Sequence, residues 1–477
     1  MLAITGLLLA QLVAAQRADE YTAEELSRQR REYSVALFAK LLCSGVFVIG
    51  RDADEFIKND LMRGAGLDVP GWDEIDVNID RARRSVTLTV EGVTPRKAVY
   101  VGDQGCVLMP HGVDFPLFTP ARVPRTIPNA EETAWPMGDV VEGDIPPGVD
   151  AKALEAALDR AFDDSLNDVP QKTRAMVVVK GGRIVGERYA PGFERDTRHI
   201  TWSMGKSITS ALTGILVGEG EFEVTDPAPV SIWHADGDPR AEITIADLLH
   251  MSSGLKFGRG NPAEGTQYTV LDNHTYVYFG ATHVFDYSIA NVLEHPPNTV
   301  WRYRNCDPLT LGMIVRDAVE ARGETYLTFP QRALFDKIGM RNMVLETDVW
   351  GNFIMTGFDY GTARDWARFG LLHLWDGVWQ GDRILPEGWV DFVREPAPAH
   401  PSKGYGGLFW LNAGGAYASL PRDMFWPAGH MGQVCYVVPS RDTVIVRLGH
   451  SAEGGFDAYF EPVVRKILDA LGPTPTE

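Results

Sequence analysis

The stretch SMGKSITSALTGILVG, residues 203–218, decides the fold that the rest of the chain must build around. Its first four residues have the pattern S-x-x-K, with Ser203 and Lys206 at the fixed positions. Apolar side chains follow at helical spacing, at Ile208, Leu212, Ile215 and Leu216. We therefore predict a buried helix that opens at Ser203 and ends near Gly218.

The spacing of Ser203 and Lys206 suits nucleophilic catalysis. Residues i and i+3 lie on one helix face, so the lysine amine can take the serine hydroxyl proton when burial disfavours its ammonium form. The amino end of the helix also favours the negative charge that develops on an attacked carbonyl oxygen. The pattern predicts a serine nucleophile with a lysine base.

Other motifs that contain serine or histidine are weaker. Residues 253–256 repeat S-x-x-K, but Ser253 follows an apparent helix and precedes Gly254, where the helix dipole has the wrong sign for an alkoxide. Residues 205–207 end like a phosphate-binding loop, yet position 200 is isoleucine where that loop needs glycine. Neither G-x-S-x-G nor HExxH occurs, which argues against an α/β-hydrolase and a zinc hydrolase.

A second motif is Y-x-N at Tyr303, Arg304 and Asn305. If the segment is extended, the first and third side chains point to one side. The Tyr303 phenol could then shuttle a proton, and the Asn305 amide could orient an amine or a substrate carbonyl. The alternative is a tyrosine with a bonded hydroxyl beside a helix N-cap asparagine.

A third motif is H-x-G at His430, Met431 and Gly432, followed by Gln433 and a predicted strand. An amide that follows glycine can approach a reacting carbonyl closely, so the N–H groups of Gln433 and Ser203 would form a two-donor oxyanion hole. His430 would face the substrate in this arrangement. A structural histidine before a strand is the alternative.

In chain order, these three motifs resemble the serine β-lactamase and penicillin-binding superfamily. The resemblance is to its class C-like branch, which includes family VIII-type esterases and 6-aminohexanoate-dimer hydrolase. Two further phrases support it, LLHMSSGL at residues 248–255 and TARDWARFG at residues 362–370. It covers roughly residues 150–475, and it implies an antiparallel sheet flanked by helices and backed by a helical subdomain.

The resemblance also implies the roles of the site residues. Ser203 would be the acylated nucleophile, Lys206 its base, Tyr303 the proton relay, and Asn305 the residue that orients Lys206 and substrate. His430, Met431 and Gly432 stand where β-lactamases have K-T-G, so the lysine and threonine that hold a β-lactam carboxylate are missing. Antibiotic hydrolysis is therefore not expected.

The 477 residues divide into four parts by pattern. Residues 1–15 have no charge and a small-residue end, which is typical of a signal peptide, although no Lys or Arg precedes the apolar run. Residues 20–109 predict a small α+β module that begins with a capping box and includes strands at 46–49, 85–90 and 98–101. Residues 110–149 are proline-rich, either a linker or a wrapped extended segment. Residues 150–475 form the main domain, with a hairpin at 175–189 and late strands.

Charge and cysteine content exclude several classes of function. Acidic residues outnumber basic ones by 64 to 45, a net charge of −19 that disfavours nucleic acid. The four cysteines do not have the paired spacing of a zinc site, and we expect no metal or organic cofactor. Cys43 and Cys106 form either a disulfide or two buried thiols, and Cys306 and Cys435 are expected to be buried thiols.

We predict a serine hydrolase that cleaves a small ester or amide through an acyl-enzyme. The alternatives are a β-lactamase or D-amino-acid peptidase acting on cell-wall-like substrates, and a non-catalytic binding or sensor module. The aromatic segment 268–287, which includes Tyr276, Tyr278 and Phe279, either lines an apolar substrate pocket or is core. A periplasmic or secreted location is favoured over a cytoplasmic one. No later stretch is expected to span a membrane. The sequence does not indicate the oligomeric state.

Overall fold

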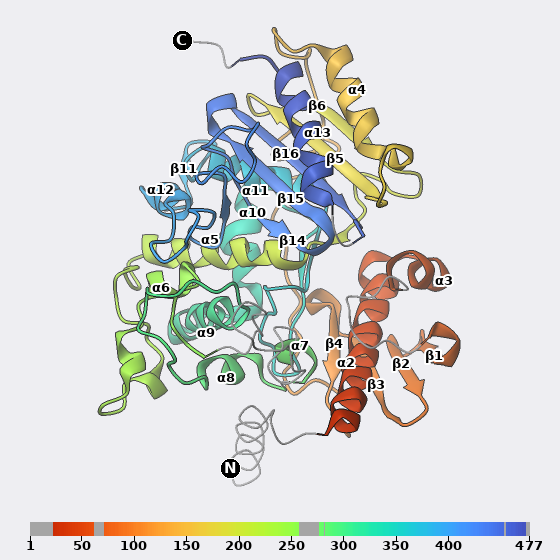
Figure 1. Cartoon of the computed structure of the whole chain (residues 1–477), viewed down its shortest axis with the longest axis vertical. Helices are drawn as coiled ribbons and strands as arrows, with labels where there is room; N and C mark the ends of the chain where they lie inside the picture. Colours follow the sequence, from red (N-terminus) through yellow and green to blue (C-terminus); the bar gives the residue numbers. More distant parts are fainter. Residues whose placement is uncertain (1–21, 62–70, 257–275, 281, 453–454, 474–477) are drawn as a thin grey trace.

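The structure, a computed structural model, describes residues 22–61, 71–256, 276–280, 282–452 and 455–473. Figure 1 shows a central antiparallel sheet with its helices in the upper part of the view and a group of helices below it. The N-terminal α+β module lies beside that group of helices. The predicted α+β fold class, an antiparallel sheet with helices and a helical subdomain, is confirmed.

The N-terminal module packs a long helix against a four-stranded antiparallel sheet in the order β1-β2-β3-β4. Helix α2 (Ala23–Ser44) begins with the predicted capping box, in which the Thr22 side chain accepts from the Glu25 N–H. The strand predicted at 46–49 is wrong, because a π-helical turn at Gly45–Ile49 extends the helix and buries its valines in the core. The other elements are α3 (Ala53–Phe56), β1 (Asp76–Asp80), β2 (Ser85–Val90), β3 (Val93–Tyr100) and β4 (Cys106–Met109).

The helical stretch Ser27–Ile49 is long and apolar enough to cross a membrane by length and composition. By length and composition it therefore departs from the expectation that no later stretch approaches the length of a membrane span. In the structure 78% of the apolar window is buried inside the protein, where the helix packs on β2 and β3. Its apolar residues therefore form the core of the module.

The central sheet has the strand order β12-β13-β15-β16-β5-β6, with β14 paired to β15. The first and last parts of the domain meet here, because β16 pairs with β5 in antiparallel register, Val444 opposite Val179. This confirms the predicted hairpin and late strands. The strands are β5 (Thr173–Lys180), β6 (Arg183–Tyr189), β12 (Trp410–Leu411), β13 (Phe425–Trp426), β14 (Ala428–Gly429), β15 (Gln433–Val438) and β16 (Thr443–Gly449).

Helices cover both faces of this sheet. Helices α4 (Ala151–Phe162) and α13 (Phe456–Ala470) share an apolar cluster with alternate residues of β5, such as Met176 and Val178. Helix α11 (Ala363–Leu374) packs on β5, β15 and β16, and Gly370 allows close approach because an added Cβ would lie 2.6 Å from Val444. The TARDWARFG phrase thus forms a helix that packs on the sheet.

The helical part of the domain surrounds helix α5 (Gly205–Gly218), which packs against α9 (Cys306–Ala321). A three-stranded sheet in the order β7-β9-β8 joins it to the segment before Ser203. The remaining elements are α6 (Ile245–Leu249), α7 (Tyr276–Phe279), α8 (Val284–Ile289), α10 (Asp336–Ile338), α12 (Trp389–Arg394), β7 (His199–Ile200), β8 (Val344–Leu345), β9 (Asp359–Gly361), β10 (Val378–Trp379) and β11 (Asp382–Arg383).

The proline-rich segment 110–149 is bound along the domain by arginines. The buried Asp139 carboxylate accepts from Arg368 at 2.5 Å, and Arg341 and Arg364 lie 3.5 Å from it. Arg368 and Arg341 also donate to backbone carbonyls of residues 136–138. Of the two predicted forms, the structure has the wrapped extended segment.

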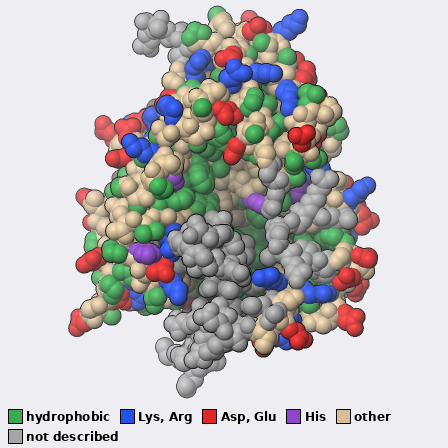
Figure 2. Space-filling view, viewed as in Figure 1, with side chains coloured by type: hydrophobic (Ala, Val, Ile, Leu, Met, Phe, Trp, Pro, Cys, Tyr) green, Lys and Arg blue, Asp and Glu red, His purple; other side chains and the backbone are tan. Residues whose placement is uncertain are grey.

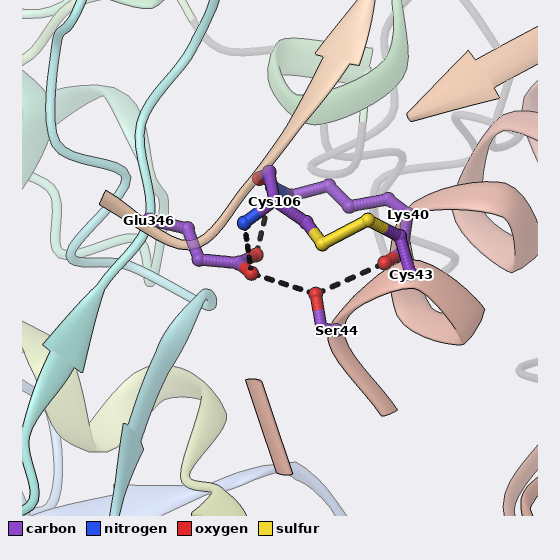
Figure 3. The surroundings of a disulfide bond; sticks show 5 residues. All are labelled: Lys40, Cys43, Ser44, Cys106 and Glu346. Carbon is purple, nitrogen blue, oxygen red and sulfur yellow. Dashed lines mark hydrogen bonds and ion pairs between the residues drawn. A yellow bond between two sulfur atoms is a disulfide. The ribbon is translucent and has the colours of Figure 1, made fainter. Parts of the chain in front are cut away.

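A disulfide and a buried ion pair hold the module together and against the domain (Figure 3). Cys43 of α2 and Cys106 of β4 are bonded, so the first of the two predicted alternatives holds. Beside them the Lys40 ammonium lies 2.8 Å from the Glu346 carboxylate, and both side chains are at most 1% exposed. The other Glu346 oxygen accepts from the Ser44 hydroxyl and the Cys106 N–H, which satisfies the buried charge.

Candidate active site

Ser203 lies in a 3₁₀ turn, Trp202–Met204, directly before helix α5. The helix therefore begins two residues later than predicted. Trp202 has a φ of +52°, a left-handed conformation that costs energy for a bulky residue and that often marks functional sites. This turn presents Ser203 half-buried at the amino end of a buried helix.

Lys206 lies one helical turn further and points back at Ser203. Its Nζ is 2.9 Å from Ser203 Oγ and 3.0 Å from the backbone carbonyl oxygen of Thr356. The side chain is only 1% exposed, so little water competes for either bond. The predicted nucleophile and base are thus within proton-transfer distance.

The Y-x-N motif reaches the same place from helix α9. Lys206 Nζ lies 4.8 Å from the centroid of the Tyr303 ring, so the structure brings Ser203, Lys206 and Tyr303 together. Asn305 is fully buried at the N-cap position of α9, where its side chain makes no cap hydrogen bond. Asn305 therefore occupies the N-cap position that the alternative predicted, but its side chain does not cap the helix.

The middle residue of the motif has a structural role. Arg304 is 1% exposed and donates to the Leu255 carbonyl, and its Nε lies 3.6 Å from Asp307. The Ser253 hydroxyl donates to Asp307 at 2.7 Å. The serine of the second S-x-x-K pattern is therefore part of a buried polar cluster, as its predicted loop position suggested.

The H-x-G motif forms a tight hairpin between β14 and β15, in which Gly429 pairs with Gln433. Strand β14 lies against the turn that carries Ser203, because a Cβ added at Gly429 would be 2.0 Å from the Thr201 carbonyl. The exposed His430 ring packs on Trp202, with ring centroids 5.5 Å apart. The histidine therefore reaches the edge of the site.

Gln433 lies behind this edge, which corrects its predicted position. Its side chain is fully buried and donates to the backbone carbonyls of His430, Met431 and Gly449. Gly429 stands between the Thr201 carbonyl and Gln433, so the geometry does not support the Gln433 N–H as the second oxyanion donor. The sequence could not reveal this, because a strand pattern does not say which strand forms the edge.

Arg447 holds the hairpin from inside the sheet. Its fully buried guanidinium donates to the carbonyls of Met431, at 3.1 Å, and Gly432, at 2.9 Å. Gly432 has a φ of +76°, and a Cβ there would lie 2.6 Å from the Phe456 ring and 2.8 Å from Arg447. The glycine of H-x-G is thus required for packing as well as for the turn.

Three residues near the catalytic pair follow from no catalytic motif. The Thr356 carbonyl accepts from Lys206 and also from the Tyr278 hydroxyl, at 2.8 Å. The fully buried Asp359 carboxylate accepts from the Thr201 hydroxyl beside Ser203. Tyr278 belongs to the predicted aromatic segment, whereas a backbone carbonyl has no sequence signal and a lone aspartate has a weak one. Residues 268–275 and 281 of that segment lie outside the described residues.

Two buried groups near Lys206, Asp359 and Tyr278, have strongly shifted pKa values. Burial raises the pKa of Asp359 to about 7, although the Thr201 hydrogen bond and the Lys206 charge both oppose the shift. Burial also holds the pKa of Tyr278 well above its usual range, so its hydroxyl remains a hydrogen-bond donor. The Ser203–Lys206 pair therefore lies beside a buried carboxyl whose pKa is raised toward neutrality.

The two free thiols do not take part in this chemistry. Cys306 and Cys435 are buried, as predicted, and burial raises the pKa of each thiol well above its usual range. Among the described residues, no group of three or more His, Cys, Asp or Glu side chains could hold a metal ion.

Figure 2 shows a hollow lined by hydrophobic side chains near the centre of the molecule, where Figure 1 draws β14.

The geometry agrees with the family comparison. The Beta-lactamase family model matches residues 159–468, well over half of the chain. The chain belongs to the Beta-lactamase family. A curated relative, 6-aminohexanoate-dimer hydrolase of Paenarthrobacter ureafaciens, is 25% identical over 293 residues, which cover 58% of this chain and 72% of the relative. This Beta-lactamase family protein is a hydrolase.

Solved structures support the same fold. A Bacillus anthracis protein described as a candidate 6-aminohexanoate-dimer hydrolase has a TM-score of 0.55 and 23% identity, covering 74% of this chain and 88% of its own. A family VIII carboxylesterase has a TM-score of 0.52 and 14% identity, covering 70% of this chain and 99% of its own. The Beta-lactamase family match at residues 159–468 covers most of the domain, and the whole N-terminal module lies outside it.

Proposed function

We propose that the protein hydrolyses a small ester or amide through an acyl-enzyme on Ser203. The 2.9 Å hydrogen bond between buried Lys206 and Ser203 carries this proposal, because it joins a nucleophile to a base in a dry site. Membership of a hydrolase family supports it. The assignment of roles to single residues rests on the geometry described above.

The reaction proceeds in two halves. Neutral Lys206 takes the Ser203 hydroxyl proton while Oγ attacks the substrate carbonyl carbon, which gives a tetrahedral oxyanion. The Ser203 N–H and a backbone N–H of the hairpin edge at Gly429 or His430 stabilise the oxyanion. The proton passes from Lys206 through Tyr303 to the leaving group, and the carbon–leaving group bond breaks. Water then attacks the acyl-enzyme, giving a carboxylic acid and free Ser203.

The substrate is an uncharged or weakly charged acyl compound. The H-x-G motif provides no lysine to hold a substrate carboxylate, and His430 packs on Trp202 at the rim. The relatives include a hydrolase of a linear amide dimer and a carboxylesterase, by their names. Asn305 lies fully buried two residues after Tyr303 and orients Lys206 and the substrate.

The proposed location is the periplasm or the outside of the cell. The apolar residues 1–15 support export, although they lie outside the described residues. The Cys43–Cys106 disulfide supports it independently, because such bonds persist in oxidising compartments. Expression with and without residues 1–15, followed by fractionation of the cells, tests the location.

Intact-mass analysis tests the acyl-enzyme. Wild-type protein mixed briefly with p-nitrophenyl esters of several acyl lengths is expected to release a burst of nitrophenolate and to gain one acyl mass. Ser203→Ala is expected to lose the adduct and to lower turnover by roughly 10³-fold or more. Ser253→Ala, the matched serine in the other S-x-x-K pattern, is the control and keeps both.

Other outcomes would redirect the proposal. Labelling of Ser203 by a fluorescent penicillin, with turnover of the β-lactam, would favour the β-lactamase or cell-wall peptidase alternative. No adduct and no turnover with any acyl length would contradict the proposed hydrolysis and favour a non-catalytic binding module. A mass adduct that survives in Ser203→Ala would contradict the choice of nucleophile.

A further inference from the structure

The Thr356 carbonyl is the fixed point to which Lys206 is tied. Lys206 Nζ donates to this oxygen at 3.0 Å and to Ser203 Oγ at 2.9 Å, so the carbonyl sets the direction of the amine toward the nucleophile. The Tyr278 hydroxyl donates to the same carbonyl oxygen at 2.8 Å and lies 3.0 Å from the Thr356 hydroxyl. Tyr278 therefore binds the group that positions the base.

Local packing is shaped for this hydroxyl. Gly357 follows Thr356, and a Cβ added there would lie 2.9 Å from the Tyr278 oxygen and 3.1 Å from its ring. The Tyr278 ring also meets Phe358 edge-on, with centroids 5.2 Å apart. Tyr278 thus contacts three consecutive residues, Thr356 to Phe358.

Tyr278 also lines a cavity of about 150 Å³ between the N-terminal module and the domain. Lys40 and Arg96 of the module line it together with Thr347 of the domain. A ring that borders a cavity lacks packing contacts on that part of its surface. The hydroxyl hydrogen bond to Thr356 therefore helps to fix its position, together with the contact to Phe358.

The module holds the helix that carries Tyr278. The buried Arg96 guanidinium donates to the Phe279 carbonyl at 3.3 Å, and Arg96 is itself 3.3 Å from Glu32 of α2. The ring of Tyr33, also on α2, meets Tyr276 edge-on at 5.7 Å. Helix α7 has only four residues, so these contacts from the module determine where it lies.

We propose that Tyr278 is a positioning residue for Lys206, and that the N-terminal module acts on the reaction by holding Tyr278 in place. This inference rests on the proposed function. The Tyr278 hydroxyl donates to the Thr356 carbonyl oxygen and so partly neutralises its negative charge. The carbonyl therefore stabilises the ammonium form of Lys206 less strongly. Loss of the hydroxyl favours the ammonium form, which cannot act as a base.

The pH dependence of kcat/KM separates this role from a purely structural one. The titratable groups that face Lys206 are Ser203, Tyr303 from the start of α9, and Asp359 from β9. In Tyr278→Phe we expect the acid limb of kcat/KM to move up by about half to one pH unit. The loss is then about 3- to 10-fold on the acid side and disappears at high pH. Repeating the profiles with Asp359→Asn removes the titration of that carboxyl.

Two further variants test the same role of the Tyr278 hydroxyl. Tyr276→Phe removes one hydroxyl from the same helix and is the matched control. It is expected to leave the acid limb of kcat/KM at the wild-type pH. Gly357→Ala keeps the Tyr278 hydroxyl but displaces it, so we expect the same upward shift as in Tyr278→Phe and no added shift in the double variant. Thermal unfolding of each variant checks that the fold is retained.

Arg96→Met tests the part played by the module. We expect Arg96→Met to shift the acid limb of kcat/KM to higher pH in the wild-type background but not in Tyr278→Phe. If Arg96→Met does not fold, Arg96→Lys is used in its place, because it keeps the positive charge beside Glu32. A Tyr278→Phe profile whose limb coincides with wild type, or a deficit that is equal at all pH values, would overturn the positioning role. Because wild type must first show the Ser203 adduct, failure of the proposed function is recognised separately.

Discussion

At the scale of single residues, one sequence pattern has two different outcomes. Ser203 and Ser253 both begin S-x-x-K, but only Ser203 has its lysine within hydrogen-bond distance. Ser253 donates to buried Asp307, whose pKa is raised by burial and lowered by Arg304 and by that same hydroxyl. The direction in which each serine points, and not the pattern, decides its chemistry.

The Ser253 hydroxyl is predicted to contribute to stability and not to turnover. In Ser253→Ala the Asp307 carboxylate loses a buried donor, which should lower the free energy of unfolding by about 1–3 kcal/mol. Urea denaturation measures this loss, and ester turnover should stay within about 2-fold of wild type. A large loss of turnover in a stably folded Ser253→Ala would contradict the assignment.

Asp359 predicts a pH-dependent stability. Folding raises its pKa to about 7, above the value of about 4 in unfolded chains. The folded protein holds this proton more tightly, so the stabilisation is complete below pH 4 and is lost as pH rises toward 7. The unfolding free energy of Asp359→Asn relative to wild type should therefore rise between about pH 4 and pH 7 and level off at higher pH. Denaturant titrations across that range test it, and a constant difference would refute it.

At the scale of elements, buried charge explains a segment that local pattern could not place. Prolines exclude helix from residues 110–149, but they do not say where an extended chain goes. Asp139 decides this, because four arginines from the domain lie within 4.0 Å of its carboxylate. Two of them, Arg364 and Arg368, belong to the TARDWARFG helix, so that phrase binds the segment as well as the sheet.

Removal of the Asp139 carboxylate is predicted to release the segment. Asp139→Ala leaves the buried Arg368 unpaired and should cost about 3–5 kcal/mol of unfolding free energy. Glu131→Ala is the matched control in the same segment, because Glu131 is 66% exposed in its ion pair with Arg195 and should cost under about 1 kcal/mol. Denaturation measures both, and limited proteolysis should cut near residues 128–140 only in Asp139→Ala. Equal costs would contradict the anchoring role.

At the scale of the whole molecule, the N-terminal module and the domain behave as one packed unit. The Glu346 carboxylate receives Lys40, Ser44 and the Cys106 N–H from the module. The Glu346 backbone N–H donates to the Phe358 carbonyl, two residues after Thr356. The module is thereby connected to the segment whose carbonyl accepts from Lys206.

The disulfide is predicted to stabilise this unit. It closes a loop with a sequence separation of 63, for which chain entropy gives about 4 kcal/mol of unfolding free energy. Denaturation of wild type and of Cys43→Ala/Cys106→Ala measures the difference. Thiol titration in denaturant should count two thiols without reductant and four after reduction. Four thiols without reductant would show that the bond does not form.

The sequence by itself determined the fold class, the paired strands at both ends of the domain, and the proximity of Ser203 and Lys206. These features are local or periodic: Ser203 and Lys206 are one helical turn apart, and alternating apolar residues mark strands wherever they pair. The wrong strand at 46–49 shows the limit of such reasoning, because burial in the module core outweighed the propensity of β-branched residues.

Only the tertiary structure decided which distant groups meet. It put Gly429 and His430, and not Gln433, at the edge beside Ser203, and it brought Tyr278 to the Thr356 carbonyl. Contacts between residues far apart in the chain depend on the packing of whole elements, and a backbone carbonyl is chemically the same at every position. For that physical reason no local pattern could have identified them.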